Sequence, residues 1–504
     1  MNDVLIVGGG LAGLAAAVAL AETGLKVQLL ESRPRLGGRA SSFEDSTTGE
    51  VIDNCQHVAM GCCTNFRHFC CVTGLDGSFR REPHLTFVGP PDPTGKRTPQ
   101  FCRFEASSFP IAAAPFHLSA TFAGLSYLSL RDKFAIGRGL LALAVDRPPA
   151  NDQRSFADWL RDNRQPENAI ERFWNIVLVS ALSESLDRIS FASARKVFVD
   201  GFLANRAGWE VWLPKVPLDG LYSERLHPWL TARGVDVRLK TGVERIIEEV
   251  NHISAVELRS GERLTAQQFI LAAPHQRTHS LLPESLRHQP QIADLARLES
   301  APIASVHLWF DRPITLLPHA VLVGRLSQWL FNRSAPASVR DSTQKPSITG
   351  DANASPLTAG YYYQVVISHA RDVAMQPHSE VVAQVVAELK AIWPWASAAQ
   401  LRHSRVVLEH HAVFSPLPGS DDFRPQQQSP IANLQFAGDW TRTGWPATME
   451  GAVRSGFLAA ENVLAHTGRT GRWLQPDLPV EWPLRLLSRR AATSKRASEN
   501  ERFP

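Results

Sequence analysis

Three glycines close to the start of the chain have the spacing of a turn that binds a phosphate group. They lie in the stretch Val4–Gly13, behind a run of apolar residues, and the Ala-rich stretch Leu14–Leu20 follows them. This pattern predicts a buried parallel strand, a tight turn and a packed helix. One glycine permits the turn, one lets backbone N–H groups approach a pyrophosphate, and one lets helix and strand touch. The residues that we assign to this dinucleotide-binding turn are Gly8, Gly10, Leu11, Ala12 and Gly13.

A carboxylate and a second glycine turn come after the next predicted strand. Lys26–Leu30 has the composition of a strand, and Glu31 follows it at about the distance where a carboxylate meets the ribose of a dinucleotide. The chain then makes a Gly-Gly-Arg turn that plain nicotinamide dehydrogenases do not need. We assign to this second part of the site Glu31, Ser32, Arg33, Gly37, Gly38 and Arg39.

A second group of residues with the character of a binding site lies near the other end of the chain. Leu434–Thr441 begins as a buried strand and contains a Gly-Asp pair, and the small-residue stretch Ala447–Gly456 predicts a helix soon after it. The first N–H groups of a helix have no partner within the helix, and its dipole favours negative charge there. The residues of interest are Gly438, Asp439, Met449, Glu450 and Gly451.

Four motifs in the first 65 residues together resemble those of a known group of enzymes. The first glycine turn, the Gly-Gly-Arg turn, Asp53–Val58 and Gly61–Asn65 together resemble the flavin-dependent amine oxidase and phytoene desaturase superfamily. Within it they are most similar to the squalene-associated branch, the hydroxysqualene dehydroxylases of hopanoid synthesis. The broader superfamily usually has a glycine near Cys55, so this chain departs from the pattern there.

The resemblance implies an α/β fold with FAD as the cofactor. A discontinuous Rossmann-like FAD-binding domain would stand beside a mixed α+β substrate domain, as in amine oxidases. Asp439 would hold the ribityl or pyrophosphate end of FAD, and Val243 would lie against the adenine. The helix beginning near Met449, with Glu450 and Gly451 in its first turn, would face the carbonyl edge of the flavin. The electron donor that recharges the flavin is not implied.

The resemblance also implies a reaction, the reduction of hydroxysqualene to squalene by hydride transfer from reduced flavin. Because hydroxide is a poor leaving group, we expect a proton donor, and His57 and Glu450 are the candidates. Each of them is also open to a structural or cofactor-binding role. Three other functions stay open: a carotenoid (phytoene-type) desaturase, an amine oxidase, and a non-catalytic flavoprotein or lipid-binding scaffold.

The predicted elements divide the chain into alternating segments of two domains. The FAD-binding domain is expected at 1–75, 213–275 and 405–468, and the substrate domain at 76–212 and 276–404. Within the latter, 333–360 is rich in Ser, Ala, Pro, Thr and Asp and predicts a mobile insertion. Residues 469–504 form a basic tail, either a solvated, largely disordered segment or one that adsorbs to a membrane.

Segment 115–145 alternates apolar residues with Arg131, Lys133 and Arg138. This composition suits helices that lie on a membrane surface, and it also suits helices packed on the substrate domain. A long apolar isoprenoid substrate, as the resemblance implies, would be taken up from lipid. Peripheral contact with the membrane is therefore one of the two interpretations.

Composition and charge exclude several classes of protein. The chain of 504 residues has 44% hydrophobic and 20% charged residues and a net charge of +4, which predicts no nucleic-acid partner. All six cysteines lie between 55 and 102 without Cys-x-x-Cys spacing, so we expect reduced thiols and no metal site. The first strand starts too early for a signal peptide, and no apolar run of about 18 residues or more is present. We expect a cytoplasmic protein, with the inner face of the membrane as its possible site of contact.

Overall fold

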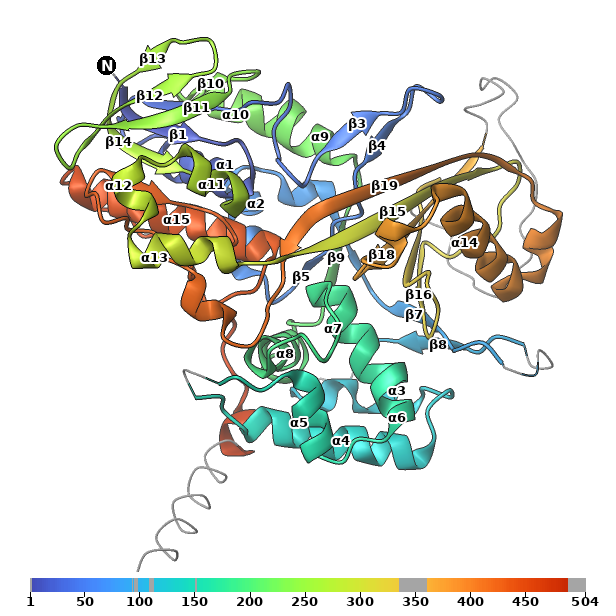
Figure 1. Ribbon diagram of the computed structural model, residues 1–504. Helices are drawn as coiled ribbons and strands as arrows, with labels where there is room; N and C mark the ends of the chain where they lie inside the picture. The colour runs from blue at the N-terminus through green and yellow to red at the C-terminus, as the bar shows by residue number, and fades with distance from the viewer. Residues whose placement is uncertain are drawn as a thin grey trace, which may run out of the picture.

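The computed structural model describes residues 2–92, 94, 98–107, 113–149, 152–334 and 360–487. Figure 1 shows three parts: a parallel sheet with its helices, a second sheet built around two long strands, and a group of helices at the bottom of the view. Most of the expected insertion at 333–360 and the final residues 488–504 of the expected tail lie outside the described residues.

The parallel sheet contains the first glycine turn. Its five strands all run parallel in the order β10-β2-β1-β14-β20. Alternate residues of β1 face opposite sides: Val4 and Ile6 enter the core under the helices, whereas Leu5 and Val7 enter a second core. Burial on both sides explains why Val4–Val7, the buried part of this strand, is an unbroken apolar run. The strands are β1 (Asn2–Val7), β2 (Val27–Leu30), β10 (Asp236–Arg238), β14 (Ala266–Leu271) and β20 (Leu434–Phe436).

Helices cover one face of the parallel sheet and a small antiparallel sheet covers the other. The helix α1 (Leu11–Leu20) is buried along its whole length and packs on α15 (Met449–His466). A Cβ atom at Gly456 would lie 2.1 Å from the carbonyl oxygen of Ala12, so only glycine permits this close approach. The opposite face carries β11 (Val243–Glu248), β12 (Ile253–Leu258) and β13 (Arg263–Leu264).

The second sheet has seven strands in the order β19-β15-β18-β17-β16-β7-β8, antiparallel except for the pair β16 and β7. One face packs on α14 (His378–Ile392) and buries Val306, Leu308 and Val365 there. We call the opposite face, which carries Ser305 and His307, the inner face. The strands are β19 (Leu401–Phe414), β15 (Ser300–Phe310), β18 (Tyr361–Ser368), β17 (Trp329–Asn332), β16 (His319–Leu322), β7 (Leu85–Val88) and β8 (Phe101–Phe104).

The helical part is held together by aromatic side chains. Trp159 stacks on Phe191, and Trp174 meets Phe198 edge to face at a centroid distance of 4.9 Å. Ser129 and Ser155 cap α4 and α5 through capping boxes. The helices are α3 (Ser119–Ala123), α4 (Leu130–Val145), α5 (Phe156–Asp162), α6 (Glu167–Ala169), α7 (Asn175–Leu182) and α8 (Phe191–Phe198).

Shorter elements connect these parts. Strands β3 (Ser42–Glu44) and β4 (Val51–Asp53) form a hairpin, and β5 (Ala59–Met60), β9 (Val211–Pro214) and β6 (Phe79–Glu82) form a small sheet. The remaining α-helices are α2 (Thr64–Val72), α9 (Leu218–Leu221), α10 (His227–Thr231), α11 (His275–Leu281), α12 (Glu284–Arg287) and α13 (Pro290–Ala293). Segments of 3-10 or π helix are η1 (Asp76–Ser78), η2 (Phe116–Leu118), η3 (Ile170–Trp174), η4 (Val199–Leu203), η5 (Tyr222–Leu226), η6 (Asp294–Arg297), η7 (Val373–Met375), η8 (Pro394–Ala398) and η9 (Ser420–Phe423).

Two boundaries differ from the sequence-based expectation. Strand β19 belongs to the seven-stranded sheet up to Phe414, so this sheet extends past residue 404. Residues 469–487 are also not a free tail: Asp477 pairs with Arg454, and Glu481 accepts hydrogen bonds from the backbone N–H groups of Ala114 and Arg206. This segment fastens α15 to the helical part, because its few acidic and apolar residues find specific partners there. Among the described helices, none combines the length and apolar character needed to cross a bilayer.

Candidate functional site: an FAD cradle at the domain boundary

The first glycine turn has no room for side chains. Gly8 adopts a φ of +113°, and a Cβ atom there would lie 2.6 Å from the carbonyl oxygen of Ala272. A Cβ atom at Gly13 would lie 1.9 Å from the carbonyl oxygen of Gly8. No side chain caps the first turn of α1 among the described residues, and Leu11 and Ala12 begin that turn. The N–H groups there point out of the turn as a site for an anion.

The Gly-Gly-Arg turn packs directly against the first glycine turn. The N–H group of Gly37 donates to the carbonyl oxygen of Gly9 over 2.8 Å. A Cβ atom at Gly38 would lie 3.0 Å from the Cα atom of Gly10, and one at Gly37 would lie 2.2 Å from the carbonyl oxygen of Ala40. Two stretches of backbone without side chains are therefore in contact, so no side chain blocks the approach of a pyrophosphate group.

Glu31 fixes the geometry of this cradle. Its carboxylate is buried and accepts hydrogen bonds from the N–H group of Gly9 at 2.7 Å, the N–H group of Arg33 at 2.8 Å and the hydroxyl of Ser32 at 3.1 Å. A carboxylate has about four acceptor positions, so capacity remains for a ribose hydroxyl.

Val243 lies close to the same strand end. The carbonyl oxygen of Glu31 accepts from the N–H group of Thr241, two residues before Val243, over 2.8 Å. Val243 begins β11 and is buried in the core that also contains Leu30. The structure thus brings together the two positions expected at the ribose and at the adenine.

The two distant ends of the chain meet at one ion pair. Arg39 lies 2.6 Å from the carboxylate of Asp439, which is buried, and also donates to the carbonyl oxygen of Ala412 at 2.8 Å. Burial disfavours the charged guanidinium, but Asp439 outweighs that effect and raises the pKa of Arg39 above its ordinary value. Gly438 beside it donates from its N–H group to the hydroxyl of Ser455.

Arg424 organises the loop after Asp439, and no sequence motif identified it. The buried guanidinium of Arg424 donates to the carbonyl oxygens of Asp439 at 3.1 Å, Thr441 at 2.6 Å and Trp445 at 2.7 Å. It therefore holds the chain between β20 and α15 in one conformation. An isolated arginine in a polar segment has no spacing signal, so only the folded geometry identifies its role.

Glu450 lies in the first turn of α15 but faces another helix. Its carboxylate accepts from the backbone N–H groups of Asn65 at 3.1 Å and Phe66 at 2.8 Å, in the first turn of α2, and pairs with Arg454 at 2.7 Å. These contacts occupy both oxygens of the carboxylate and join the two helices. We therefore propose no proton-transfer role for Glu450.

The first turn of α15 carries a side-chain cap. Thr448 precedes it, and its side chain accepts from the N–H group of Gly451 over 3.0 Å. Met449 is half-buried against the core around α1. The helix end thus lies beside the α1 side of the cradle, where the resemblance places the flavin.

His57 lies just beyond β4 and is only partly exposed. Its Nδ1 donates to the carbonyl oxygen of Cys55 over 3.0 Å, and burial lowers its pKa below the ordinary value. The ring is therefore neutral at pH 7, with Nε2 left as its other polar atom. Burial also raises the pKa of Cys55 to about 12, which keeps that thiol protonated.

Asp53 and Gln56 join the FAD-binding side to the seven-stranded sheet. Asp53 accepts from the N–H group of Leu218 at 2.8 Å and forms an ion pair with Arg333 at 2.9 Å. The same arginine donates to the side-chain oxygen of Gln56 at 2.5 Å. Arg333 was not predicted as a functional residue, because it stands at the edge of a segment whose composition suggested no structure.

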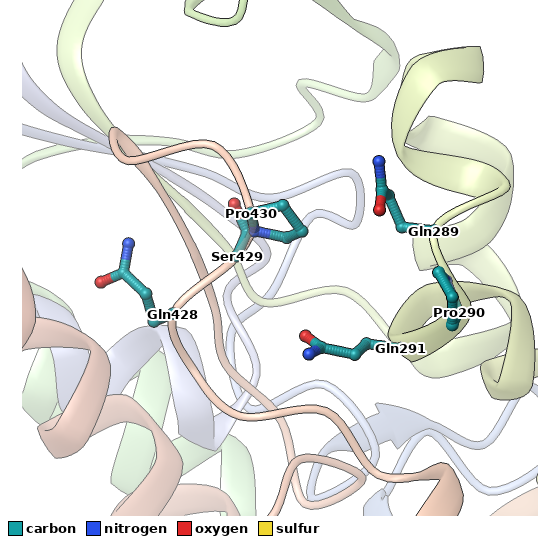
Figure 2. A pocket seen from close by; sticks show the side chains of 6 residues that line it. All are labelled: Gln289, Pro290, Gln291, Gln428, Ser429 and Pro430. Atoms are coloured by element: carbon teal, nitrogen blue, oxygen red, sulfur yellow. The ribbon is translucent and has the colours of Figure 1, made fainter.

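A surface recess elsewhere contains no groups suited to redox chemistry. Figure 2 shows this cavity of about 450 Å³ between the start of α13 and the loop before β20. Its lining residues are Gln289, Pro290, Gln291, Gln428, Ser429 and Pro430. Among the described residues no cluster of three or more His, Cys, Asp or Glu side chains is arranged to hold a metal, and the six cysteines are free thiols.

The residues of the cradle fit FAD on structural grounds. Four features match the parts of a dinucleotide. The two glycine turns expose backbone without side chains, and the N-terminus of α1 has no side-chain cap. The carboxylate of Glu31 lies at the end of β2, and Asp439 comes from the far end of the chain.

The comparisons with known proteins agree with this geometry. The family model of flavin containing amine oxidoreductases matches residues 11–464. The chain belongs to this family and is an FAD-dependent oxidoreductase.

Its relatives include proteins named as phytoene and zeta-carotene desaturases. A 15-cis-phytoene desaturase of Synechococcus elongatus is 28% identical over 92% of this chain and 96% of its own length. A probable zeta-carotene desaturase of the same organism is also 28% identical, over 92% of this chain and 98% of its own. Among solved structures, an oxidoreductase from Methanosarcina mazei is similar with a TM-score of 0.66 and 16% identity, covering 93% of this chain and all of the other, which shows the shared fold.

Proposed function

We propose that this protein is a carotenoid-type desaturase, which removes hydrogen from a long apolar isoprenoid. The observation that carries the proposal is the similarity to a phytoene desaturase and a zeta-carotene desaturase along nearly the whole of all three chains. Because that similarity covers 92% of this chain, it includes the seven-stranded sheet and the helical part as well as the cradle. Bound FAD would supply the redox chemistry by accepting a hydride.

Residues of this chain would bind and orient the cofactor at the boundary between the two domains. The glycine turns would hold the pyrophosphate, and Asp439, fixed by Arg39 and Arg424, would hold the ribityl region. The N-terminus of α15 would stabilise negative charge on the reduced ring through its N–H groups. Arg333, through Asp53 and Gln56, would keep the inner face of the seven-stranded sheet in contact with the FAD-binding domain and exclude water.

A second candidate function is the reductive removal of an allylic hydroxyl from hydroxysqualene. It is favoured by the resemblance of Asp53–Val58 and Gly61–Asn65 to the squalene-associated branch. Hydride would then move toward the substrate, and His57 would be the remaining candidate proton donor. Its low pKa makes the charged ring scarce at pH 7, so this role for His57 demands a substrate that raises its pKa.

The redox response of the bound flavin separates these functions. Oxidised holoenzyme under anaerobic conditions should lose its flavin absorbance with phytoene if it is a desaturase. Photoreduced holoenzyme should regain that absorbance with hydroxysqualene if it is a dehydroxylase. Putrescine tests the amine-oxidase alternative. A flavin spectrum that phytoene, hydroxysqualene and putrescine all leave unchanged would indicate a non-catalytic flavoprotein.

We also propose that α4 touches the membrane. Leu130 and Phe134 are 85% and 76% exposed, and Leu141 is half-exposed on the same side of the helix. The exposed residues Arg131 and Arg138 stand beside them. Apolar tips flanked by basic groups suit an anionic lipid surface, from which a long isoprenoid would be taken up.

A further inference from the structure

Exposed apolar side chains gather on the helical part and on the end of the described chain. Among the described residues twelve large apolar side chains are exposed, and seven of them lie on η2, α4 and residues 480–486. Three are the residues of α4 named above, and the other four are Phe116, Val480, Trp482 and Leu486. Single exposed apolar side chains are normal on a protein surface, whereas a concentration of them marks a contact site.

The segment that carries the last three of these side chains is fixed to the helical part. The carboxylate of Glu481 accepts from the backbone N–H groups of Ala114 at 2.7 Å and Arg206 at 2.8 Å. Leu484 is only 3% exposed and belongs to a small core that it shares with Ala144 of α4. The backbone around residue 482 is therefore held by specific contacts on two sides.

Trp482 and Leu486 point away from this small core. Residues 482–487 are helical, and side chains four positions apart lie on the same face of a helix. Trp482 is 60% exposed and Leu486 is 51% exposed, although Leu484 between them is buried. Phe116, two residues beyond the Ala114 that binds Glu481, is 57% exposed. Large apolar groups are thus presented to solvent from an ordered backbone.

The apolar surface of this segment is continuous with that of α4. Leu140 of α4 packs on the same small core as Leu484, and the next residue, Leu141, is 49% exposed. Leu141 lies seven residues after Phe134, which is two helical turns and the same face of α4. Figure 1 shows the last described residues, in red, beside the helical part that contains α4.

The charges around this surface favour an anionic partner. Arg138 on α4 and Arg147 just beyond its end are exposed. The carboxylates of Asp146 and Glu481 at the same junction are already engaged, the first with a basic side chain and the second with backbone N–H groups. In the sequence, 488–504 adds five basic and two acidic residues. Tryptophan is enriched where a protein meets the headgroups of a bilayer, and basic groups beside it bind anionic lipid.

We propose that the helical residues 482–487 bind an anionic lipid bilayer together with α4, and that Trp482 and Leu486 enter its apolar layer. This inference rests on the proposed function, which includes the membrane contact of α4, and it adds a second element to that contact. The same segment pairs with α15 through Asp477 and Arg454. The lipid-binding surface is therefore joined to the helix that begins at the flavin end of the cradle.

Co-sedimentation of the holoenzyme with vesicles of phosphatidylcholine and phosphatidylglycerol tests the surface. Replacing both Trp482 and Leu486 with Ser should weaken binding by roughly tenfold, because two apolar side chains no longer enter the bilayer. The same pair of substitutions should weaken it by a similar further factor when Leu130 and Phe134 are already Ser, since separate contacts with one bilayer add in free energy. Thermal unfolding verifies that each variant is folded.

The matched control replaces Val250 and Met375 with Ser. These side chains are 100% and 87% exposed and lie outside the helical part, so their loss should leave vesicle binding unchanged.

A local measurement reports on Trp482 itself. Of the thirteen tryptophans it is the only exposed one, so lipid with brominated chains should quench its fluorescence selectively. Trp482→Phe keeps an apolar ring and should retain most of the vesicle binding while it abolishes the quenching.

Vesicle binding that survives the loss of Trp482 and Leu486 would overturn the inference, and so would the absence of quenching in the bound wild type. If the variant instead loses a dimer in light scattering and keeps its vesicle binding, the surface belongs to a second copy of the chain and the lipid assignment fails. Turnover of phytoene in detergent separates the proposed function from the surface, because it needs no bilayer. A wild type that binds vesicles as expected and leaves phytoene unchanged would refute only the desaturase function.

Discussion

The guanidinium of Arg39 lies 2.6 Å from the carboxylate of Asp439, although 400 residues separate them in the chain. One residue ends the Gly-Gly-Arg turn against the first glycine turn, and the other follows β20 at one edge of the parallel sheet. This pair joins the first and last parts of the cradle. The proposed FAD site therefore forms only when both ends of the chain have folded together.

Asp439→Asn and Arg39→Gln should each weaken FAD binding by roughly tenfold, because removing one partner leaves the other buried charge uncompensated. The dissociation constant is measured from the recovery of free flavin fluorescence on dilution. Arg103→Gln breaks an exposed ion pair with Glu105 and should leave the constant unchanged. Unchanged FAD affinity in both cradle variants would show that the pair is not part of the site.

Gly13→Ala should abolish FAD retention. The added Cβ atom would lie 1.9 Å from the carbonyl oxygen of Gly8, so the helix and the turn must separate. The ratio of flavin to protein absorbance after purification reports the loss. Gly137→Ala is the matched control, since that glycine lies in α4 and the added Cβ would meet no heavy atom within 4 Å apart from the backbone of its own helix turn. A yellow, fully loaded Gly13→Ala protein would contradict the close packing on which the cradle depends.

Much of the cradle followed from the sequence, because glycines at fixed spacing and a carboxylate at a strand end act through local backbone geometry. The positions at Gly8, Gly37 and Glu31 are of this kind. Arg424 and Arg333 were not predicted, because each acts by reaching partners far away in the chain, and a single arginine has no periodic signal. Only tertiary structure brings such partners together.

Glu450 was identified from the sequence, but the contacts of its side chain were not. Its place at the start of a small-residue helix was predicted, but the direction of its side chain was not, and it points at α2. The acidic residues of the C-terminal segment were likewise hidden within a basic composition. Asp477 and Glu481 give that segment its specific contacts, which an overall charge count does not reveal.

Glu184→Gln should destabilise the protein, because this buried carboxylate ties the end of α7 to two strands of the seven-stranded sheet. It accepts from Arg371 at 2.6 Å and from the hydroxyl of Ser415 at 2.7 Å, and pairs with His369 at 3.0 Å. We expect a loss of about 2 kcal/mol in the free energy of unfolding, below the full value for a buried pair because Arg371 is partly exposed. Urea unfolding at pH 7 measures it.

The effect of this substitution should depend on pH. Burial alone would raise the pKa of Glu184, but the hydrogen bonds from His369, Arg371 and Ser415 outweigh it and hold the pKa far below the ordinary value of 4.5. A depressed pKa gives stability that is present above pH 4.5 and declines as the pH falls through the folded-state pKa. The difference between wild type and Glu184→Gln should therefore shrink in acid. A constant difference, or an equal loss in the exposed control Glu105→Gln, would contradict the assignment.

Replacing both Leu130 and Phe134 with Ser should weaken binding to anionic vesicles by roughly tenfold or more, because two exposed apolar side chains no longer enter the bilayer. Co-sedimentation with vesicles of mixed anionic and zwitterionic lipid measures it. Met375→Ser removes an equally exposed apolar side chain, at 87%, from η7, and should have no effect. Equal vesicle binding by the wild type and both variants would contradict the proposed membrane contact of α4.

The most direct test of the central claim is an anaerobic single turnover of oxidised holoenzyme with phytoene. We predict that the flavin absorbance falls and that one molecule of a product with one additional double bond forms per bound FAD. Recovery of unchanged phytoene from a protein that retains oxidised FAD throughout would contradict the desaturase account.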